Sequence, residues 1–291
     1  MIISVSRRTD IPAYYADWFF GRLKEGYALV RNPRNPAQIT RVPIDPESVN
    51  GFVFWSKNPS PMLVRLNLLN QYTYYFQFTV TPYGTDLEPN VPDKKNIIIP
   101  AFRRLADSIG AKRVIWRYDP ILLNSRYNFA YHLRAFDAIA KALCGATEKC
   151  IFSFVDSYKN TFHNKAALDL SNISCEQQHM FAKELSLIAK GYGIALETCA
   201  EQIDLSAFCI DHAHCIDASL IQSLAGNKLP LKKAHGQRSL CGCAQSVDIG
   251  AYNSCENGCL YCYANYSKAL VRKNLADYDL SSPLLCERLT Q

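Results

Sequence analysis

The stretch YTYYFQFTV, residues 72–80, decides the fold class of this chain. Every residue in it except Gln77 is aromatic or β-branched, and such residues favour β-strands. The near absence of polar alternation is typical of a strand covered on both faces, as strands in parallel sheets are. Five further runs of this kind predict strands over residues 2–6, 51–55, 113–118, 150–155 and 194–199.

Segments with helical periodicity separate these predicted strands. They cover residues 13–26, 100–110, 129–145 and 175–193, and the first three end at a glycine, as helices commonly do. Repeated strand-then-helix order predicts parallel strands joined by right-handed crossovers, which is an α/β fold. We favour a TIM-like, partial parallel β/α barrel over a doubly wound sheet, because no glycine-rich phosphate-binding fingerprint follows the first strand.

Length and composition set further bounds. A chain of 291 residues can bury a full core, and we interpret residues 1–200 as barrel units and residues 201–291 as a cysteine-rich segment that completes the barrel. Residues 83–96 and 226–238 are predicted as surface loops. The net charge of +6 comes from scattered Lys and Arg residues, so it permits a polyanionic partner without indicating one. The chain shows neither a secretory leader nor an apolar run of bilayer length, and we expect a cytoplasmic protein with no membrane partner.

The cysteines are the strongest chemical signal. All twelve lie from Cys144 onward, and five fall between Cys241 and Cys262. In a reducing compartment this clustering indicates metal ligands rather than disulfides. The segment CENGCLYC places Cys255, Cys259 and Cys262 in the spacing C-x3-C-x2-C, and three thiolates on one loop can hold three irons of a [4Fe–4S] cluster while the fourth iron stays open.

Four further cysteines are candidate ligands of a second [4Fe–4S] cluster: Cys199, Cys215, Cys241 and Cys243. Cys209, His212 or His214 could replace one of these four. Zinc is the main alternative to iron, because Cys259 and Cys262 form a pair typical of structural zinc sites and Cys241 and Cys243 form a poorer one.

Charged residues follow several of the predicted strands, where barrel enzymes build their active sites. The candidate catalytic residues at these strand ends are Arg7, Arg8, Asp10, Lys57, Arg117 and Asp119. A substrate chamber is expected to be lined by Trp55, Lys57, Trp116, Arg117 and Tyr118. Two alternatives stay open: Asp10 precedes Ile11 and Pro12 as a helix cap would, and the two tryptophans could face helices instead.

The run SVDIGAYNSCENGCLYCYAN, residues 246–265, resembles the signature of the radical S-adenosylmethionine (SAM) superfamily, and most of all its spore photoproduct lyase and DNA repair photolyase-like branch. The resemblance implies a cluster that chelates SAM and cleaves it to a 5′-deoxyadenosyl radical, an electron donor such as a ferredoxin or flavodoxin, and a nucleic-acid substrate as one option. It also implies a circularly permuted barrel, because the superfamily carries this motif after its first strand. In that arrangement residues 246–250 form a final strand, 251–262 its loop and 263–278 the following helix, and this strand–loop–helix unit lies beside the first strand.

On this resemblance, the end of the first strand should receive the SAM amino group and carboxylate. Asp10 is then the contact for the amino group, Arg7 or Arg8 the contact for the carboxylate, and Tyr261 a cofactor contact beside the last cysteine. The chain departs from the superfamily here, since SRRTD stands where a Gly-Gly-Glu motif is expected.

Over nearly its whole length the chain also resembles an uncharacterised family, domain of unknown function 1848. The shared blocks are SVSRRTDIPAYYADWF, VFWSKNP, YYFQFTVTPYG, VIWRYDPI, IFSFVDSY, ETCAEQIDL, HCID and QRSLCGCAQSVDIGAYNSCENGCLYCYAN. The family pattern has cysteines at all seven candidate ligand positions but not at Cys209. Two rival functions stay open: an iron–sulfur protein that transfers electrons or acts as a Lewis acid without SAM, and a nucleic-acid-binding module with structural zinc.

Overall fold

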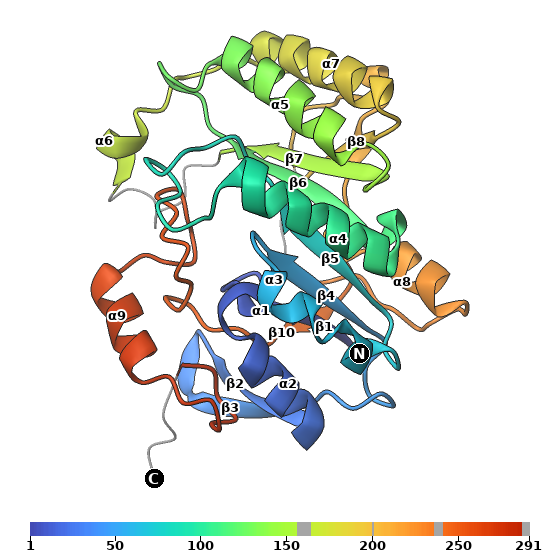
Figure 1. Cartoon of the computed structure of the whole chain (residues 1–291), viewed down its shortest axis with the longest axis vertical. Helices are drawn as coiled ribbons and strands as arrows, with labels where there is room; N and C mark the ends of the chain where they lie inside the picture. The colour runs from blue at the N-terminus through green and yellow to red at the C-terminus, as the bar shows by residue number, and fades with distance from the viewer. Residues whose placement is uncertain (156–163, 200, 236–240, 287–291) are drawn as a thin grey trace.

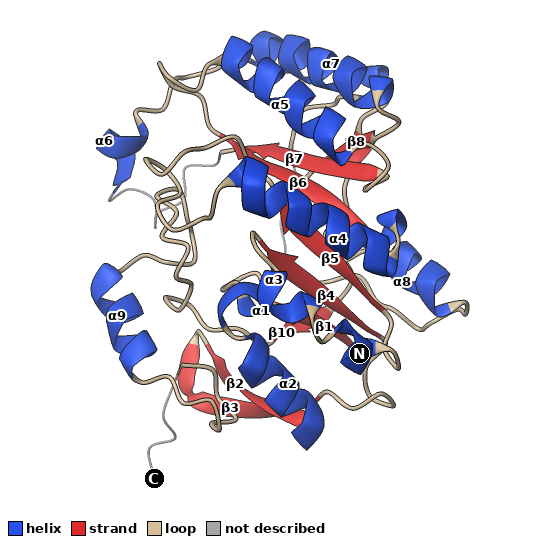
Figure 2. Ribbon diagram, viewed as in Figure 1, coloured by secondary structure: helices blue, strands red, loops and turns tan. Residues whose placement is uncertain are grey.

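The structure is a computed structural model that describes residues 1–155, 164–199, 201–235 and 241–286. Its main sheet has eight strands, all parallel, in the order β10-β1-β4-β5-β6-β7-β8-β9, drawn as red arrows in Figure 2. Their bounds are β1 Ile2–Val5, β4 Gly51–Ser56, β5 Tyr74–Thr79, β6 Val114–Ile121, β7 Lys149–Phe154, β8 Ala195–Thr198, β9 Asp211–His212 and β10 Ser246–Asp248. The predicted α/β fold with a partial parallel barrel is therefore confirmed.

The last strand of the sheet lies beside the first strand of the chain. β10 pairs in parallel with β1, with Ile2 opposite Ser246 and Ser4 opposite Asp248. This contact joins the two halves of the sequence in one sheet and carries the loop after β10 to the carboxyl end of β1. The predicted placement of the final strand–loop–helix unit beside the first strand is thus confirmed.

Helices cover the outer face of the sheet, as Figure 1 shows for α4, α5 and α7. The α-helices are α1 Ile11–Tyr14, α2 Ala16–Glu25, α3 Ser60–Leu63, α4 Ile99–Ile109, α5 Phe129–Leu143, α6 Lys165–Leu168, α7 Cys175–Gly191, α8 Ala218–Ala225 and α9 Lys268–Ala276. Short helical turns are η1 Leu66–Leu69, η2 Lys94–Ile98, η3 Ala111–Arg113 and η5 Ser206–Phe208. The helix predicted over residues 13–26 is two helices, because the chain leaves helical geometry at Tyr15, whose buried phenol donates to the Ser254 carbonyl.

The strands bury both faces, which explains their nearly continuous apolar sequences. Phe52, Phe76 and Trp116 pack on the helix side, while Val53 and Tyr75 point inward against α8. The inner face also carries polar groups that hold a cysteine segment. Tyr75 Oη and Gln77 Nε2 both donate to the Cys215 carbonyl, at 2.8 and 3.0 Å. The inner wall of the sheet therefore fixes the position of Cys215.

The structure contains a hairpin that was not expected, and it corrects the prediction for residues 83–96. An antiparallel hairpin of β2 (Tyr27–Asn32) and β3 (Asn35–Pro43) follows α2, and Leu29 N–H donates to the Pro283 carbonyl of the C-terminal segment at 2.9 Å. Residues 83–96 are not a surface loop throughout, because Leu87 and Glu88 are buried and Leu260 N–H donates to the Leu87 carbonyl. Apolar side chains within this segment pin it against the cysteine loop.

The second predicted loop, residues 226–238, is described as far as residue 235, and its last three residues lie outside the described ranges. Its described part is mostly exposed or half-buried, with Leu229 and Leu231 packed on the inner core. Of the helices in the described ranges, none combines the length and apolar composition that crossing a bilayer requires.

Candidate functional site

A cavity of about 380 Å³ lies at the carboxyl ends of the parallel strands. All seven predicted ligand cysteines line it: Cys199, Cys215, Cys241, Cys243, Cys255, Cys259 and Cys262. The other five cysteines, all within the described ranges, lie outside this lining: Cys144, Cys175 and Cys209 are exposed, and Cys150 and Cys286 are buried elsewhere. The fold therefore gathers at one cavity the cysteines that the sequence singled out.

The loop of Cys255, Cys259 and Cys262, called here the triad loop, is held from three sides. Asn257 accepts from Tyr14 Oη at 2.9 Å and donates to Asp10 at 3.1 Å, while Asn90 N–H donates to the Asn257 carbonyl. Gly258 has a φ of 67°, and a side chain there would also press on Pro89 and Asn90 at 3.1–3.2 Å. A tight, pre-set loop thus presents its three thiols to the cavity.

Burial controls the chemistry of these three thiols. It raises the pKa of Cys255 to about 12, with the charge of Asp10 adding to the rise, and it raises the pKa of Cys259 and Cys262 as well. Lys57 opposes this effect at Cys259 and Cys262. Thiols buried in this way become thiolates most readily when a cationic metal compensates the charge, which fits ligation rather than free nucleophiles.

The remaining four cysteines form a second group on the other side of the cavity. Cys199 follows β8, and its sulfur lies 3.1 Å from that of Cys215. The Cys243 sulfur accepts from Ile216 N–H at 3.4 Å. The hydrogen bond to Cys215 lowers the pKa of Cys243. Cys209, His212 and His214 do not line the cavity, so the group predicted from sequence has the better placement.

The donor set fits an iron–sulfur cluster. Soft thiolates, backbone N–H donors to sulfur and a shielded cavity are the features that hold and tune such clusters. Cysteine thiolates also ligate zinc, at about 2.3 Å. The cavity therefore offers soft thiolate donors that suit either an iron–sulfur cluster or zinc.

Lys57 and Tyr261 belong to a buried charged network behind the triad loop. Lys57 Nζ lies 2.7 Å from Glu88 Oε1 and 3.0 Å from Tyr261 Oη, and the Tyr261 phenol also donates to Glu88. Glu88 further accepts from Thr81 and forms an ion pair with Lys94. Burial alone would raise the pKa of Glu88, but the two lysines lower it to about 2. Burial likewise disfavours the Lys57 charge, yet Glu88 raises the Lys57 pKa overall.

Arg117 and Asp119 line the cavity beside the second cysteine group. Arg117 donates from Nε to Asp119 Oδ1 at 3.0 Å and from Nη1 to the Cys215 sulfur at 2.9 Å. A permanent cation therefore faces one thiol while a carboxylate fixes its orientation.

Of the two arginines after β1, only Arg7 lines the cysteine cavity. Its guanidinium lies 5.9 Å from the centre of the Trp55 ring, and its Nε is 3.8 Å from Asp248 Oδ2. Arg8 turns the other way, donates to the Gly250 carbonyl at 3.3 Å and stacks over Tyr252. Arg7 and Arg8, although consecutive after β1, thus contact different surroundings.

Asp10 is placed differently from its predicted role as a cofactor contact. It caps α1 by accepting from Ala13 N–H at 3.1 Å, and its other oxygen accepts from Lys57 N–H at 2.8 Å and from Asn257. Burial raises the Asp10 pKa, and these hydrogen bonds oppose the rise. Because Asp10 does not line the cavity and both its oxygens are engaged, we assign it to positioning the triad loop instead.

The expected chamber lining is corrected at two positions. Trp116 and Tyr118 face the helices: the Trp116 ring stacks on Phe136 of α5 at 4.7 Å, and Tyr118 packs edge-on against the same ring. Trp55, Lys57 and Arg117 do line the cavity. Because side chains alternate along a strand, Arg117 points inward while its neighbours Trp116 and Tyr118 point outward toward the helices.

With the geometry established, comparison with known protein families gives one match. A family model described as domain of unknown function (DUF1848) matches residues 2–264. The chain belongs to this family. The DUF1848 match contains all seven cavity cysteines, and its description assigns no activity. A comparison with curated proteins finds no similar sequence.

Three residues within the DUF1848 match were not identified as site residues from the sequence: Glu88, Asp248 and Asn257. Asp248 ends β10 and accepts from Ser4 Oγ at 2.7 Å and from Arg7 N–H at 2.8 Å, which fastens β10 to the end of β1. Its place in the run SVDIGAYNSCENGCLYCYAN, which leads into the triad loop, was a usable signal. Glu88 carried no such signal, because it stands in a Pro- and Asp-rich stretch typical of exposed loops.

Proposed function

We propose that this chain is an iron–sulfur enzyme of the radical SAM type, with an open-iron [4Fe–4S] cluster on Cys255, Cys259 and Cys262. The observation that carries the proposal is the convergence of seven cysteines on one cavity at the carboxyl ends of a parallel barrel, with the triad on a single loop. Parallel barrels build their active sites at this end. An incompletely ligated cluster in such a cavity is a reaction centre rather than a structural element.

Cys255, Cys259 and Cys262 would hold the cluster, which would supply the electron for reductive cleavage of SAM. The residues of the chain bind and orient. Arg7 is proposed to bind the SAM carboxylate, because it lines the cavity at the strand end next to the triad loop. Lys57 and Tyr261 hold the triad loop against the buried Glu88 carboxylate. Trp55, Arg117 and Asp119 line the space left for a substrate.

The second group, Cys199, Cys215, Cys241 and Cys243, is proposed to hold a fully ligated [4Fe–4S] cluster that relays electrons or contacts the substrate. Its electrons would come from a small donor protein such as a ferredoxin or flavodoxin. We place the enzyme in the cytoplasm, where such donors and reduced thiols are found.

The test is anaerobic purification with iron and sulfide analysis, followed by dithionite reduction with SAM. We expect about eight irons per chain, from two four-iron clusters, and release of 5′-deoxyadenosine. A C255A/C259A/C262A variant should lose about half of the iron and all SAM cleavage, while C209A, which changes an exposed cysteine outside the cavity, should keep both.

The second candidate is an iron–sulfur protein that transfers electrons or acts as a Lewis acid without SAM. It is favoured by Asp10 and Arg8, two expected SAM contacts that do not line the cysteine cavity. It predicts cluster iron without 5′-deoxyadenosine. Zinc in place of iron, together with salt-sensitive oligonucleotide binding, would instead support the zinc-containing nucleic-acid-binding module and overturn both iron–sulfur functions.

A further inference from the structure

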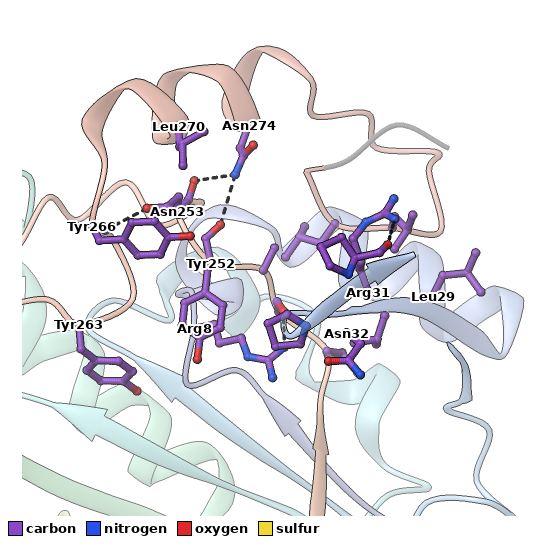
Figure 3. A pocket seen from close by; sticks show the side chains of 18 residues that line it. Arg8, Leu29, Arg31, Asn32, Tyr252, Asn253, Tyr263, Tyr266, Leu270 and Asn274 are labelled. Atoms are coloured by element: carbon purple, nitrogen blue, oxygen red, sulfur yellow. Dashed lines mark hydrogen bonds between the residues drawn. The ribbon is translucent and has the colours of Figure 1, made fainter. Parts of the chain in front are cut away.

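We propose that a second cavity, on the far side of the β1 strand end, binds a nucleotide unit, meaning a phosphate joined to a flat base, and that it holds part of the substrate of the proposed enzyme. This cavity, called here the tyrosine cavity, has a volume of about 470 Å³ and is shown in Figure 3. It lies between the β2–β3 hairpin, the segment that leads into the triad loop, and α9. The inference rests on the proposed function for its role, but the binding itself is testable without it.

Charge on the wall of the tyrosine cavity is positive. Arg8 and Arg31 both line it, and no acidic side chain is among its described lining residues. Asp248 is the nearest carboxylate to Arg8, at 3.9 Å from its Nε, but Asp248 is buried and already accepts hydrogen bonds from Ser4, Ser6 and the Arg7 N–H. The hairpin strengthens this field, because residues 27–43 contain three arginines and no acidic residue. An anionic ligand is therefore favoured.

Aromatic rings supply the other half of the recognition. Tyr252, Tyr263 and Tyr266 line the cavity, and Tyr266 is 44 % exposed although its ring is large and apolar. The Arg8 guanidinium lies 5.1 Å from the centre of the Tyr252 ring, which orients the cation at the cavity floor. Exposed aromatic rings beside guanidinium groups are the usual means of stacking a base and pairing its phosphate.

The scaffold of the cavity is rigid. Asn274 of α9 donates to the Tyr252 and Asn253 carbonyls at 3.2 and 3.0 Å, as the dashed lines in Figure 3 show. Asn253 Oδ1 in turn accepts from Tyr266 N–H at 2.9 Å. These bonds tie α9 to the segment before the triad loop and fix the backbone that carries Tyr252 and Tyr266.

The tyrosine cavity adjoins the cysteine cavity. Tyr263 lines both, and its phenol donates to the Arg7 carbonyl at 2.7 Å. Arg7 and Arg8, consecutive in sequence, enter the two cavities from one strand end. A ligand held by Arg8 and Tyr266 would therefore sit next to the triad loop, on the opposite side of Tyr263 from the cysteines.

The test measures binding to the anaerobically purified protein by fluorescence anisotropy with a short labelled oligothymidylate, and by calorimetry with AMP and with inorganic phosphate. We expect AMP to bind more tightly than phosphate. Y266L should weaken AMP binding about tenfold through lost stacking, while Y266F should retain it. R8Q should weaken binding and flatten its salt dependence, whereas R104Q, an exposed arginine on α4, should change neither.

The two sources of a nucleotide unit give different results. Tighter binding of the oligothymidylate than of AMP identifies a nucleic-acid strand, and the reverse identifies a free nucleotide. The proposal is overturned if neither ligand binds, if phosphate binds as tightly as AMP, or if Y266L and R8Q leave binding unchanged. SAM cleavage is assayed on the same preparation, so loss of nucleotide binding with cleavage intact rejects this inference alone, and the converse rejects the proposed function alone.

Discussion

The Arg117 guanidinium and the Cys215 sulfur are direct hydrogen-bond partners, 2.9 Å apart, at the wall of the cysteine cavity. Burial disfavours the Arg117 charge, but Asp119 and the thiols of Cys215 and Cys199 raise its pKa well above the ordinary value. The cation is therefore permanent, and it faces the second cysteine group.

This contact predicts the redox behaviour of the second cluster. A cation and a hydrogen bond at a ligating sulfur favour the reduced, more negative state, so R117Q should lower the reduction potential. A change of about 1 kcal/mol corresponds to about 40 mV for one electron. Redox titration followed by electron paramagnetic resonance measures the shift, and R117K, which keeps the charge, should show a smaller one. An unchanged potential in R117Q would show that Cys215 does not ligate a redox-active cluster.

Arg7 lines the cysteine cavity and Arg8 lines the tyrosine cavity, so we expect SAM binding to depend on Arg7 and nucleotide binding to depend on Arg8. Only Arg7 enters the cysteine cavity, so R7Q should weaken SAM binding by about tenfold or more, the loss of one charged hydrogen-bond donor. R8Q should leave SAM binding unchanged, because Arg8 faces the tyrosine cavity. Equilibrium binding of labelled SAM to the reduced protein checks both. A larger effect from R8Q than from R7Q would reverse the assignment.

Glu88 predicts how stability depends on pH. Its pKa in the folded protein is about 2, against an ordinary value of 4.5, so its contribution to the free energy of unfolding is present in full above about pH 5 and is lost as the pH falls toward 2. The size of this contribution is about 3 kcal/mol. Urea unfolding of wild type and E88Q at several pH values should show the largest difference at neutral pH and the smallest near pH 2. A difference independent of pH would contradict the ionised state of Glu88.

Gly250 predicts a steric limit where β10 meets β1. A Cβ at this position would lie 2.6 Å from Ser6 Cβ and 2.2 Å from Ser6 Oγ. Rotation of Ser6 cannot move its own Cβ, so G250A should shift the strand ends and lower the free energy of unfolding by about 1–3 kcal/mol. G191A is the matched control, because nothing lies within 4 Å of a Cβ there. Thermal melting of both variants checks the prediction. If G250A were as stable as the wild type, the ends of β1 and β10 would have to shift without cost.

The strands β1 and β4 to β8 and the gathering of the seven cavity cysteines were predictable from the sequence, each for a physical reason. A run of aromatic and β-branched residues such as 72–80 favours a strand covered on both faces, and the observed β5 lies within it. The triad was recognisable because its spacing lies within one loop. The grouping of Cys199 with Cys215 was less constrained, since it joins residues 16 positions apart through the β8 and β9 ends.

The sequence did not decide to which face of the sheet each strand side chain points. A strand buried on both faces has no polar side to set its orientation, so the inward position of Trp55 and the outward position of Trp116 could not be separated in advance. The buried Glu88 was hidden for the opposite reason: its neighbours are polar, and only Lys57, Lys94 and Tyr261 from other segments make its burial favourable. The β2–β3 hairpin carries Pro33 in its turn and Pro36 near the start of β3, which interrupts the strand pattern.

The pairing of β10 with β1 also sets an order for maturation. β10 (Ser246–Asp248) is synthesised long after β1 (Ile2–Val5), so the hydrogen-bonding edge of β1 stays unpaired until the cysteine-rich segment has been made. The same late segment carries the triad loop, with Cys255, Cys259 and Cys262. A nascent or truncated chain ending before Ser246 would expose an apolar strand edge, which invites aggregation. The strand that pairs with β1 and the triad loop therefore become available at the same stage of synthesis.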